Sequence, residues 1–331
     1  MRFGLALRAA GALVFVLAAL VPATAAEVSL RTMSFNARYA GTAEGLFGEN
    51  GWYNFGDPSD ARNLKAIQVA KDYAPDILGT QELLYFQLDD FSGATLAGGL
   101  TDYDYYGVGR ENGVALGEFA AIFYLRDRFN LVDSGTFWLS QTPEVAGSKY
   151  PGAGSIRIAS WVVLDDASSG QELFVLNTHL DNSSSAARSY AAGLIRDFLP
   201  SLAGNLPTLV MGDMNATETT SVLTTLRGVG DPDFPELQDA YRVVHPVKLS
   251  NEATYHNFSG GTGGSRIDFI LNTDDFTPQD ATIVRTTYNG RYPSDHYPVT
   301  ADFTLAVVPE PGTRVLFLLG IAALFATRFR H

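Results

Sequence analysis

Polar residues stand at the ends of strand-like apolar runs along this chain. The stretch LPTLVMGDMN shows the pattern: residues 208–211 read as a buried strand, and Asp213 and Asn215 follow directly. Five further runs of this kind cover residues 30–36, 76–82, 172–179, 267–271 and 297–305. Each run meets a carboxylate, an amide or an imidazole at one end, so six strands with polar ends are predicted.

The polar strand ends predict a shared site. Polar residues commonly stop strands, so a single case carries little weight. Six cases in one chain favour a common cause. If the strands lie side by side, their ends form one rim of Asn, Glu, Asp and His side chains. Such a rim suits a hard divalent cation, which prefers oxygen ligands, together with an anionic substrate.

The first predicted helix begins at Asp57-Pro58. Asp57 offers a capping oxygen, and proline is favoured in the first turn. The apolar spacing then predicts a buried face made of Leu64, Ile67 and Ala70. The charged residues expected mostly off that face are Arg62, Lys65 and Lys71.

A second helix is predicted over residues 184–202. Its residues spaced for burial are Tyr190, Leu194, Phe198 and Leu202. The glycine-rich segments 147–155 and 259–265 are predicted to be loops.

Composition indicates an ordered, enzyme-like body. The chain has 331 residues, 46% of them hydrophobic, which is ample for a large core. It contains no cysteine, which excludes a disulfide framework, a thiolate metal site and a cysteine nucleophile. Because no fixed-period repeat and no low-complexity linker divides the sequence, one domain is expected over residues 27–306.

The N-terminal segment reads as a secretory signal peptide over residues 1–26. Arg2 and Arg8 precede an apolar run over residues 9–21, and small residues follow at 23–26. The alternative is an N-terminal membrane anchor, which the short apolar run disfavours.

The C-terminal segment, residues 307–331, reads as a processed sorting signal. Its apolar stretch 315–326 spans roughly 18 Å as a helix, against a hydrocarbon core of roughly 30 Å. Arg328 and Arg330 follow it. The order VPEP, apolar run, RFR resembles the PEP-CTERM tail of exported bacterial proteins. That resemblance implies export to the periplasm, cell surface or exterior, transient anchoring by the tail, and a membrane sorting protease as partner.

The charge balance argues against a non-specific nucleic-acid binder. The full chain has a formal net charge of −13, and its two terminal segments hold five arginines and one glutamate, so the body alone carries −17. The overall field of such a body repels polyanions. A local cationic or metal-filled cleft remains compatible with this charge.

The motifs together resemble the endonuclease/exonuclease/phosphatase superfamily. They occur in the family's order as SFN, TQE, GR with GEFAAIFY, NTHLD, GDMN, RIDFI and SDHYPV, from about Leu30 to Thr304. The pair GDMN and SDHYPV is the specific part. The resemblance implies a four-layer α/β sandwich, in which two packed mixed β-sheets are flanked by helices. It also implies hydrolysis of phosphodiester or phosphomonoester bonds with Mg²⁺ or Mn²⁺ as cofactor.

The resemblance assigns metal binding to three residues. Glu82 in TQE corresponds to the family's principal metal ligand, with Asn36 beside it. Asp295 would assist the metal or the water. The glycine-rich segment 41–58 leaves a second acidic ligand undecided, with Glu44 and Glu49 as candidates.

The resemblance assigns the remaining roles around the phosphate. Asp213 corresponds to the residue that orients or deprotonates the attacking water, and Asn215 would hold that water or a phosphoryl oxygen. His179 would contact the phosphoryl group. The supporting residues are Glu118 as the acid paired with His179, Asp268 as the acid that orients His296, His296 itself, and Arg110 as a phosphate contact. A plain surface arginine is an equal alternative for Arg110. Met214 departs from the aromatic residue that many relatives carry there.

The sequence is compatible with several functions. A nuclease competes with a lipid or small-molecule phosphodiesterase, and a monomer acting on a phosphate-ester substrate is expected. The aromatic residues that could stack bases or face a lipid are Trp52, Tyr53, Tyr105, Trp138 and Tyr255, although packing alone also explains them. A non-catalytic surface or matrix protein with the same fold is the alternative from another class. A two-acid glycosidase fits poorly because it leaves the histidines unexplained.

Overall fold

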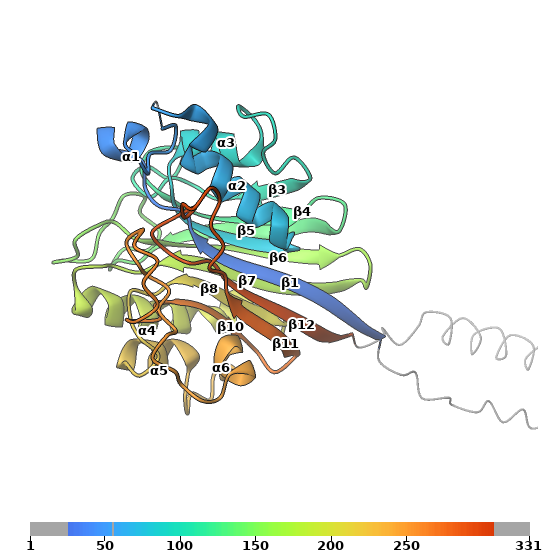
Figure 1. Cartoon of the computed structure of the whole chain (residues 1–331). Coiled ribbons are helices and arrows are strands. Elements are labelled where there is room, and N and C mark those ends of the chain that lie inside the picture. Colours follow the sequence, from blue (N-terminus) through green and yellow to red (C-terminus); the bar gives the residue numbers. More distant parts are fainter. Residues whose placement is uncertain (1–25, 55, 308–331) are drawn as a thin grey trace, which may run out of the picture. The chain divides into compact units, whose positions relative to one another are not determined.

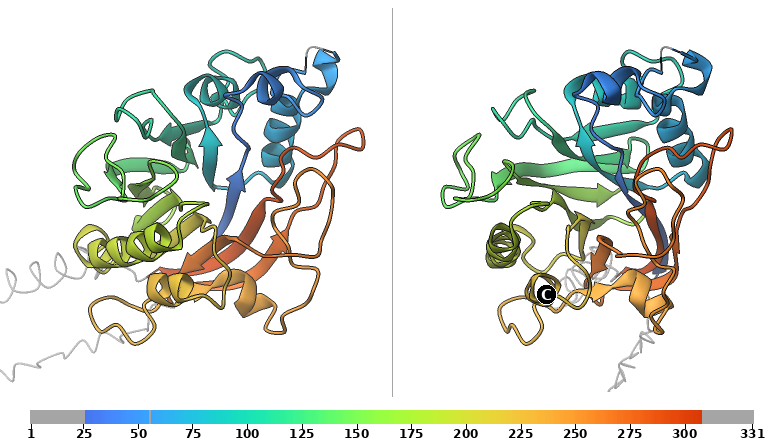
Figure 2. Two further views of the ribbon diagram at one scale, coloured as in Figure 1. Left: turned by 90° about the vertical axis from the view of Figure 1, so that its left-hand side faces the viewer. Right: turned by 60° about the vertical axis from the view of Figure 1, so that its left-hand side comes forward.

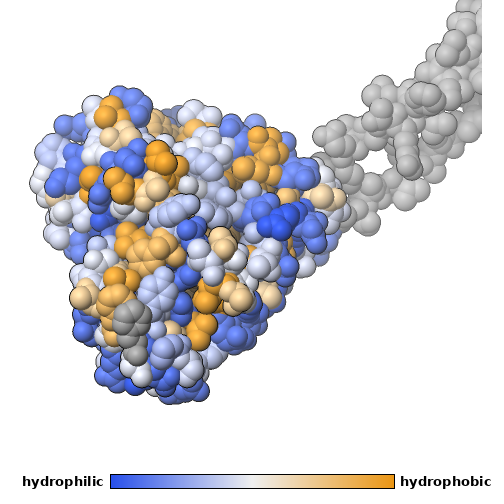
Figure 3. All heavy atoms as spheres, turned by 90° about the horizontal axis from the view of Figure 1, so that it is seen from above, coloured by the Kyte–Doolittle hydropathy of each residue, from blue (hydrophilic) through white to orange (hydrophobic). Residues whose placement is uncertain are grey.

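The computed structural model describes residues 26–54 and 56–307, and residues 27–307 form one compact unit. The predicted signal peptide and sorting tail lie outside the described residues, apart from border residues 26 and 307. Among the described helices, none has the length and hydrophobicity needed to cross a membrane. Figure 3 shows hydrophobic residues in small separate groups among hydrophilic ones on one face of the protein.

The first sheet holds six strands in the order β11-β12-β1-β2-β4-β3. Its strands in chain order are β1 (Ala26–Asn36), β2 (Ile77–Leu83), β3 (Tyr103–Tyr106), β4 (Phe119–Leu125), β11 (Phe276–Ile283) and β12 (Val299–Val307). The central strands β1 and β2 are parallel, and Asn36 pairs with Gln81. This register brings Asn36 and Glu82 to the same edge of the sheet, as the strand-end pattern predicts.

The second sheet holds six strands in the order β5-β6-β7-β8-β10-β9. Its strands are β5 (Phe129–Trp138), β6 (Ile158–Asp166), β7 (Gln171–His179), β8 (Thr208–Asp213), β9 (Gln238–Asp239) and β10 (Asp268–Asn272). In the parallel pair β7 and β8, His179 lies opposite Asp213. In the antiparallel pair β8 and β10, Asp268 lies opposite Asp213. Backbone register alone therefore aligns three of the predicted site residues.

The two mixed sheets pack face to face and carry helices on their outer faces (Figures 1 and 2). A core between the sheets joins residues such as Ile77 and Ile122 to Val175 and Met211. The helices that pack on the first sheet are α2 (Arg62–Tyr73) and α3 (Tyr85–Ser92), and those on the second are α4 (Ser185–Leu202) and α5 (Ser221–Arg227). The predicted four-layer α/β sandwich is confirmed. The shorter helices are α1 (Ala43–Phe47), η1 (Pro58–Asp60) and α6 (Ala240–Val244).

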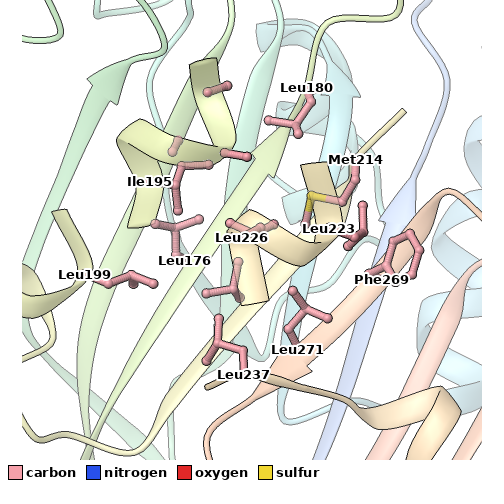
Figure 4. Packing of buried hydrophobic residues seen from close by; sticks show 14 of the residues in the cluster. Leu176, Leu180, Ile195, Leu199, Met214, Leu223, Leu226, Leu237, Phe269 and Leu271 are labelled. Atoms are coloured by element: carbon pink, nitrogen blue, oxygen red, sulfur yellow. The ribbon is translucent and has the colours of Figure 1, made fainter. Parts of the chain in front are cut away.

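Figure 4 shows how α4 and α5 close the outer face of the second sheet. Ile195 and Leu199 of α4, with Leu226 of α5, pack against Leu176 of β7. Met214 is fully buried in the same cluster, where it packs beside the strand end that carries Asp213. The departure from an aromatic residue is thus accommodated in the core.

A buried amide network joins the two sheets directly beneath the polar rim. Gln81 Nε2 on β2 donates to Asn177 Oδ1 on β7 at 2.7 Å. Asn177 Nδ2 in turn donates to the carbonyl oxygens of Thr80 and Ala121 at 2.9 and 2.8 Å. Gln81 and Asn177 are both fully buried. Gln81 Oε1 has no partner, but all three bonds join β7 to the first sheet, and losing them would leave further buried groups unpaired, so they favour this alignment of the two sheets.

The first predicted helix is wrong in its start and in part of its buried face. Ile67 and Ala70 are buried as predicted, and Lys71 is exposed. Asp57 caps the short η1, and α2 begins separately at Arg62. Leu64 is 39% exposed, whereas Arg62 and Lys65 are buried. Lys65 Nζ pairs with Asp60 Oδ1 at 2.7 Å, and the Arg62 guanidinium donates to the carbonyl oxygens of Ala37 and Asn50. These partners hold two cations on the inner side, which apolar spacing alone does not reveal.

The second predicted helix is confirmed as α4, with Ser184 as its N-cap. Its buried stripe, however, is made of Ala187, Ala191, Ile195 and Leu199. The residues predicted for burial, Tyr190, Leu194, Phe198 and Leu202, are only partly buried, and they flank that stripe. Small alanines face the sheet because the helix packs closely on it. The predicted loops 147–155 and 259–265 contain no helix or strand.

Gly212 is expected to be irreplaceable, because β7 and β8 approach closely beside it. Its φ is 145°, and an added Cβ would lie 1.9 Å from the carbonyl oxygen of Thr178. Gly212→Ala should lower the free energy of unfolding by about 3 kcal/mol, measured by chemical denaturation. Gly193→Ala on α4 is the matched control, because its added Cβ meets no atom within 4 Å other than its chain neighbours and the backbone of its own helix. This control should gain about 0.5–1 kcal/mol. Equal effects of the two substitutions would contradict this account.

Candidate active site

A cleft of about 350 Å³ opens where the polar ends of both sheets meet. From the first sheet side it is lined by Arg38, Tyr39 and Glu82, and from the second by His179 and Asp213. The remaining lining residues are Glu118, Ser155, Arg157, Asn182, Asn215, Tyr255, Ile267 and His296. The strand ends therefore converge into one pocket, as their pattern predicts.

Glu82 and Asn36 form the half of the site that belongs to the first sheet. Asn36 Nδ2 donates to Glu82 Oε1 at 3.0 Å and to Asp213 Oδ2 at 3.1 Å, so one amide links both sheets. The backbone N–H of Tyr39 donates to Glu82 Oε2 at 2.7 Å. Burial acts to raise the pKa of Glu82, but the positive charge of His296 and these hydrogen bonds hold it below its usual value. Glu82 is therefore ionised at neutral pH.

Arg38 lies between two carboxylates at the cleft wall. Its guanidinium is 3.7 Å from Glu82 Oε2 and 3.4 Å from Asp295 Oδ2. Asp295 is buried behind the cleft, and burial raises its pKa. The two acids are thus arranged around one positive charge, and the Arg38 side chain is 46% exposed.

Asp213 lies at the centre of the site between two histidines. His179 Nε2 is 3.4 Å from Asp213 Oδ2, and His296 Nε2 is 3.8 Å from the same oxygen. The backbone N–H of Asn215 donates to Asp213 Oδ1 at 2.9 Å. Burial and the neighbouring Asp268 raise the pKa of Asp213 to about 7. A carboxylate with such a pKa can accept a proton from water near neutral pH.

The two histidines have different charge states. His296 Nδ1 is hydrogen-bonded to Asp268 Oδ2 at 3.0 Å. Burial disfavours the charged ring, yet Asp268 and Asp213 raise the pKa of His296 to about 10. For His179, burial and the nearby Arg157 hold the pKa well below its usual value. His296 is therefore an imidazolium at neutral pH, whereas His179 is neutral.

Glu118, Arg110 and Arg157 form a cationic corner of the site. Arg110 Nη1 donates to Glu118 Oε2 at 2.7 Å, and Arg157 Nη1 lies 3.8 Å from the same oxygen. His179 Nδ1 is 3.8 Å from Glu118 Oε2, which places the predicted acid and histidine side by side. Burial raises the pKa of Glu118 against the effect of Arg110.

Three non-glycine residues that line the cleft have a left-handed backbone. Arg38, Glu82 and Asn215 adopt φ values of 65°, 68° and 45°. Non-glycine residues rarely occupy this left-handed region, which costs of order 1–3 kcal/mol each. Asn215 thereby turns out of the strand, which ends at Asp213. Its Nδ2 donates to the carbonyl oxygen of Leu180 at 3.0 Å.

Of the predicted site residues, six line the cleft and four stand behind it. The lining ones are Glu82, Glu118, His179, Asp213, Asn215 and His296, and those behind are Asn36, Arg110, Asp268 and Asp295. Arg110 is not among the residues that line the cleft, and its guanidinium is paired with Glu118, so its phosphate contact stays a prediction. Arg157 lines the cleft and was not among the predicted residues. The only sequence signal for it is an arginine directly before the apolar run that forms β6.

Of the aromatic and acidic candidates named from the sequence, one lines the cleft. Tyr255 lines the cleft and is 45% exposed. Trp52 and Trp138 are buried, and their indole N–H groups donate to Asp90 and to the carbonyl oxygen of Arg110. Tyr53 and Tyr105 pack against the outer core of the first sheet. Glu44 and Glu49 are exposed and do not line the cleft.

One buried group has the composition of a metal site. Ligand atoms of Asp213, Asp268 and His296 lie within 4.8 Å of one another, so this group could hold a metal ion. Glu82 offers a separate carboxylate, with the Asn36 amide beside it. Carboxylate oxygens are the ligands that a hard divalent ion such as Mg²⁺ prefers.

The fold and this site define the class. A base with a raised pKa beside an imidazolium and buried guanidinium groups suits hydrolysis of a phosphate ester. Residues 33–296 match the sequence profile of the endonuclease/exonuclease/phosphatase family. The chain belongs to that family, and it is a hydrolase that acts on phosphoric ester bonds.

Individual relatives support the assignment. An endonuclease/exonuclease/phosphatase family protein from Bacteroides thetaiotaomicron is 31% identical, with a TM-score of 0.71, over 85% of this chain and 99% of that one. A mannosyl-6-phosphatase from the same species is 31% identical, with a TM-score of 0.70, over 83% and 99%. Nocturnin of Drosophila melanogaster is 26% identical over 76% of this chain and 43% of that protein. The chain thus spans less than half of that relative.

The charge on His296 predicts a specific pH dependence of stability in the metal-free protein. Its pKa is raised from 6.5 to about 10 on folding, so its stabilising contribution is fully present below 6.5 and lost as pH rises through 10. Wild type should therefore lose unfolding free energy between about pH 7.5 and about pH 10.5 more steeply than His296→Gln. Urea denaturation in the presence of a chelator measures both slopes. Parallel slopes would show that His296 is not held as a cation.

Proposed function

We propose that the protein is an exported, divalent-metal-dependent hydrolase that hydrolyses a phosphate ester bond of a small molecule, sugar or lipid. The observation that carries the proposal is the position of Asp213 between a neutral and a charged histidine in one cleft. An aspartate that serves only the fold does not require two histidines in different charge states beside it. This weighs against a surface or matrix protein that retains only the fold.

Asp213 is proposed to receive the proton of the attacking water. The water oxygen forms a bond to phosphorus as its proton passes to Asp213, and the P–O bond to the leaving group breaks. Asn215 helps to hold that water. His296 places its positive charge beside the phosphoryl oxygens, and Asp268 keeps the ring charged and oriented. His179 contacts the phosphoryl group as a neutral imidazole, so it adds no charge of its own to the site.

A divalent ion, Mg²⁺ or Mn²⁺, is proposed to bind at Glu82 rather than at the Asp213, Asp268 and His296 group. His296 in that group is an imidazolium, which repels a cation, whereas Glu82 is an ionised oxygen donor. Asn36 would join it after a rotation of its amide, because its nitrogen now faces Glu82. Asp295 supports the site from behind through Arg38. Bound there, the ion would neutralise phosphoryl charge.

Charge and cleft size favour a small substrate over a nucleic-acid strand. The body carries −17, which disfavours a long polyanion, and the cleft measures about 350 Å³. The 31% identity to a mannosyl-6-phosphatase over almost that entire chain supports the same choice. The similarity to nocturnin keeps a nucleotide or nucleic-acid substrate as the second candidate.

An activity panel with Mg²⁺ or Mn²⁺ tests the proposal. It compares mannose 6-phosphate, p-nitrophenyl phosphate, bis-p-nitrophenyl phosphate, sphingomyelin, DNA and RNA. Hydrolysis of small phosphate esters should stop on chelation and return with the ion. Asp213→Asn should lose about 10²–10⁴-fold in kcat. Asp280→Asn, an exposed acid on β11, is the control and should keep wild-type rates. Undiminished hydrolysis after chelation, or by Asp213→Asn, would refute the mechanism.

Export is proposed from the two terminal segments, which carry the order of a signal peptide and a sorting tail. N-terminal sequencing and intact mass of the protein from cell fractions check this. We expect a new N-terminus near residue 27 and recovery outside the cytoplasm. A full-length chain confined to the cytoplasm would contradict export and would not affect the proposed chemistry.

A further inference from the structure

The guanidinium of Arg157 is buried in the cleft wall without a dedicated partner. Its side chain is 7% exposed, and its Nε and Nη1 donate no hydrogen bond. Its one hydrogen bond runs from Nη2 to Asn182 Oδ1, at 3.5 Å. Burying a charge that lacks partners is expensive, so such a group points to a ligand that completes it.

The carboxylates near Arg157 are already engaged elsewhere. Glu118 Oε2 lies 3.8 Å from Arg157 Nη1, but it accepts a hydrogen bond from Arg110 at 2.7 Å. Asp181 Oδ2 lies 4.0 Å from Arg157 Nε, but the backbone N–H of Ser155 donates to it at 2.9 Å. Two N–H groups of Arg157, a residue that lines the cleft, therefore lack a hydrogen-bond partner within the protein.

Phosphate monoesters and diesters differ in their charge and in the number of non-bridging oxygens that could accept a hydrogen bond from Arg157. A phosphomonoester has a second pKa of about 6, carries about −1.5 to −2 charges at pH 7, and has three non-bridging oxygens. A phosphodiester carries one charge and has two such oxygens, because the third oxygen bears the second ester group. Arginine matches phosphate oxygens with two parallel N–H groups, which lysine does not.

We propose that Arg157 is a specificity-determining residue that binds the third non-bridging oxygen of a terminal phosphate, which makes the enzyme a phosphomonoesterase. This inference rests on the proposed function and names its substrate class. In a diester that oxygen is alkylated, so the buried guanidinium stays unpaired and the complex is disfavoured. A site built around buried donors rejects analogues that lack the matching group.

Substrate preference in an Arg157 variant tests the proposal. Wild type with Mg²⁺ should hydrolyse p-nitrophenyl phosphate with a higher kcat/KM than bis-p-nitrophenyl phosphate. Arg157→Gln should lower kcat/KM for the monoester roughly 10- to 100-fold and change the diester value less than about threefold. Arg157→Lys keeps the charge but loses the fixed, planar donors of the guanidinium, so it should recover only part of the preference. Arg126→Gln, at an exposed arginine paired with Asp104, is the control and should leave both values unchanged.

Ligand binding provides a readout that is independent of turnover. Inorganic phosphate should bind the metal-free wild type more tightly than dimethyl phosphate in calorimetry, and Arg157→Gln should remove that difference. Thermal melting verifies that the variant is folded. Equal losses on monoester and diester in a folded variant would overturn the role of Arg157 alone. Failure of wild type to hydrolyse either ester with Mg²⁺ or Mn²⁺ would overturn the proposed function and this inference with it.

Discussion

The alignment of the two sheets is the constraint on which the site depends. Each sheet supplies half of the chemistry, with Glu82 on one and Asp213 on the other. Buried amides of Gln81 and Asn177 hold the sheets together just below the cleft. Asn36 repeats the link at the rim by donating to both Glu82 and Asp213. Apolar packing between sheets tolerates small shifts, whereas these directional bonds permit one arrangement.

Charge in the cleft is organised by mutual dependence. Asp213 is surrounded by groups that pull its pKa in opposite directions, with Asp268 raising it and His296 lowering it. The same two acids keep His296 charged. The protonation state of each group depends on its neighbours, so a single substitution changes the pKa of several groups at once. Effects of such substitutions on activity will not add, and pairs must be interpreted through double-mutant cycles.

Most residues of the site could be predicted from the strand-end pattern, because the pairing of neighbouring strands brings the residues at their ends close together. A residue at the end of one central strand lies near the end of its parallel neighbour, which brings Asn36 to Glu82 and His179 to Asp213. Long-range polar contacts have no such signal. The inward position of Lys65 depends on Asp60 and on the turn of η1.

Arg157 illustrates the same limit within the site. An arginine next to a strand reads as a surface residue, and its burial depends on how the loop before β6 places Ser155 and Arg157 at the cleft. The competition between Arg110 and Arg157 for Glu118 likewise depends on tertiary placement. Sequence therefore gives the types of group in the site, while the structure decides which of them reach the wall.

The division of the catalytic groups between two sheets has a consequence for how the protein would fail. Sliding one sheet past the other by a single residue would displace its half of the groups by roughly 3.3 Å, with every strand still intact. Function would then vanish in a loosened protein whose backbone spectrum looks native. Heat, pressure or mild denaturant should accordingly abolish activity under milder conditions than those that unfold the protein.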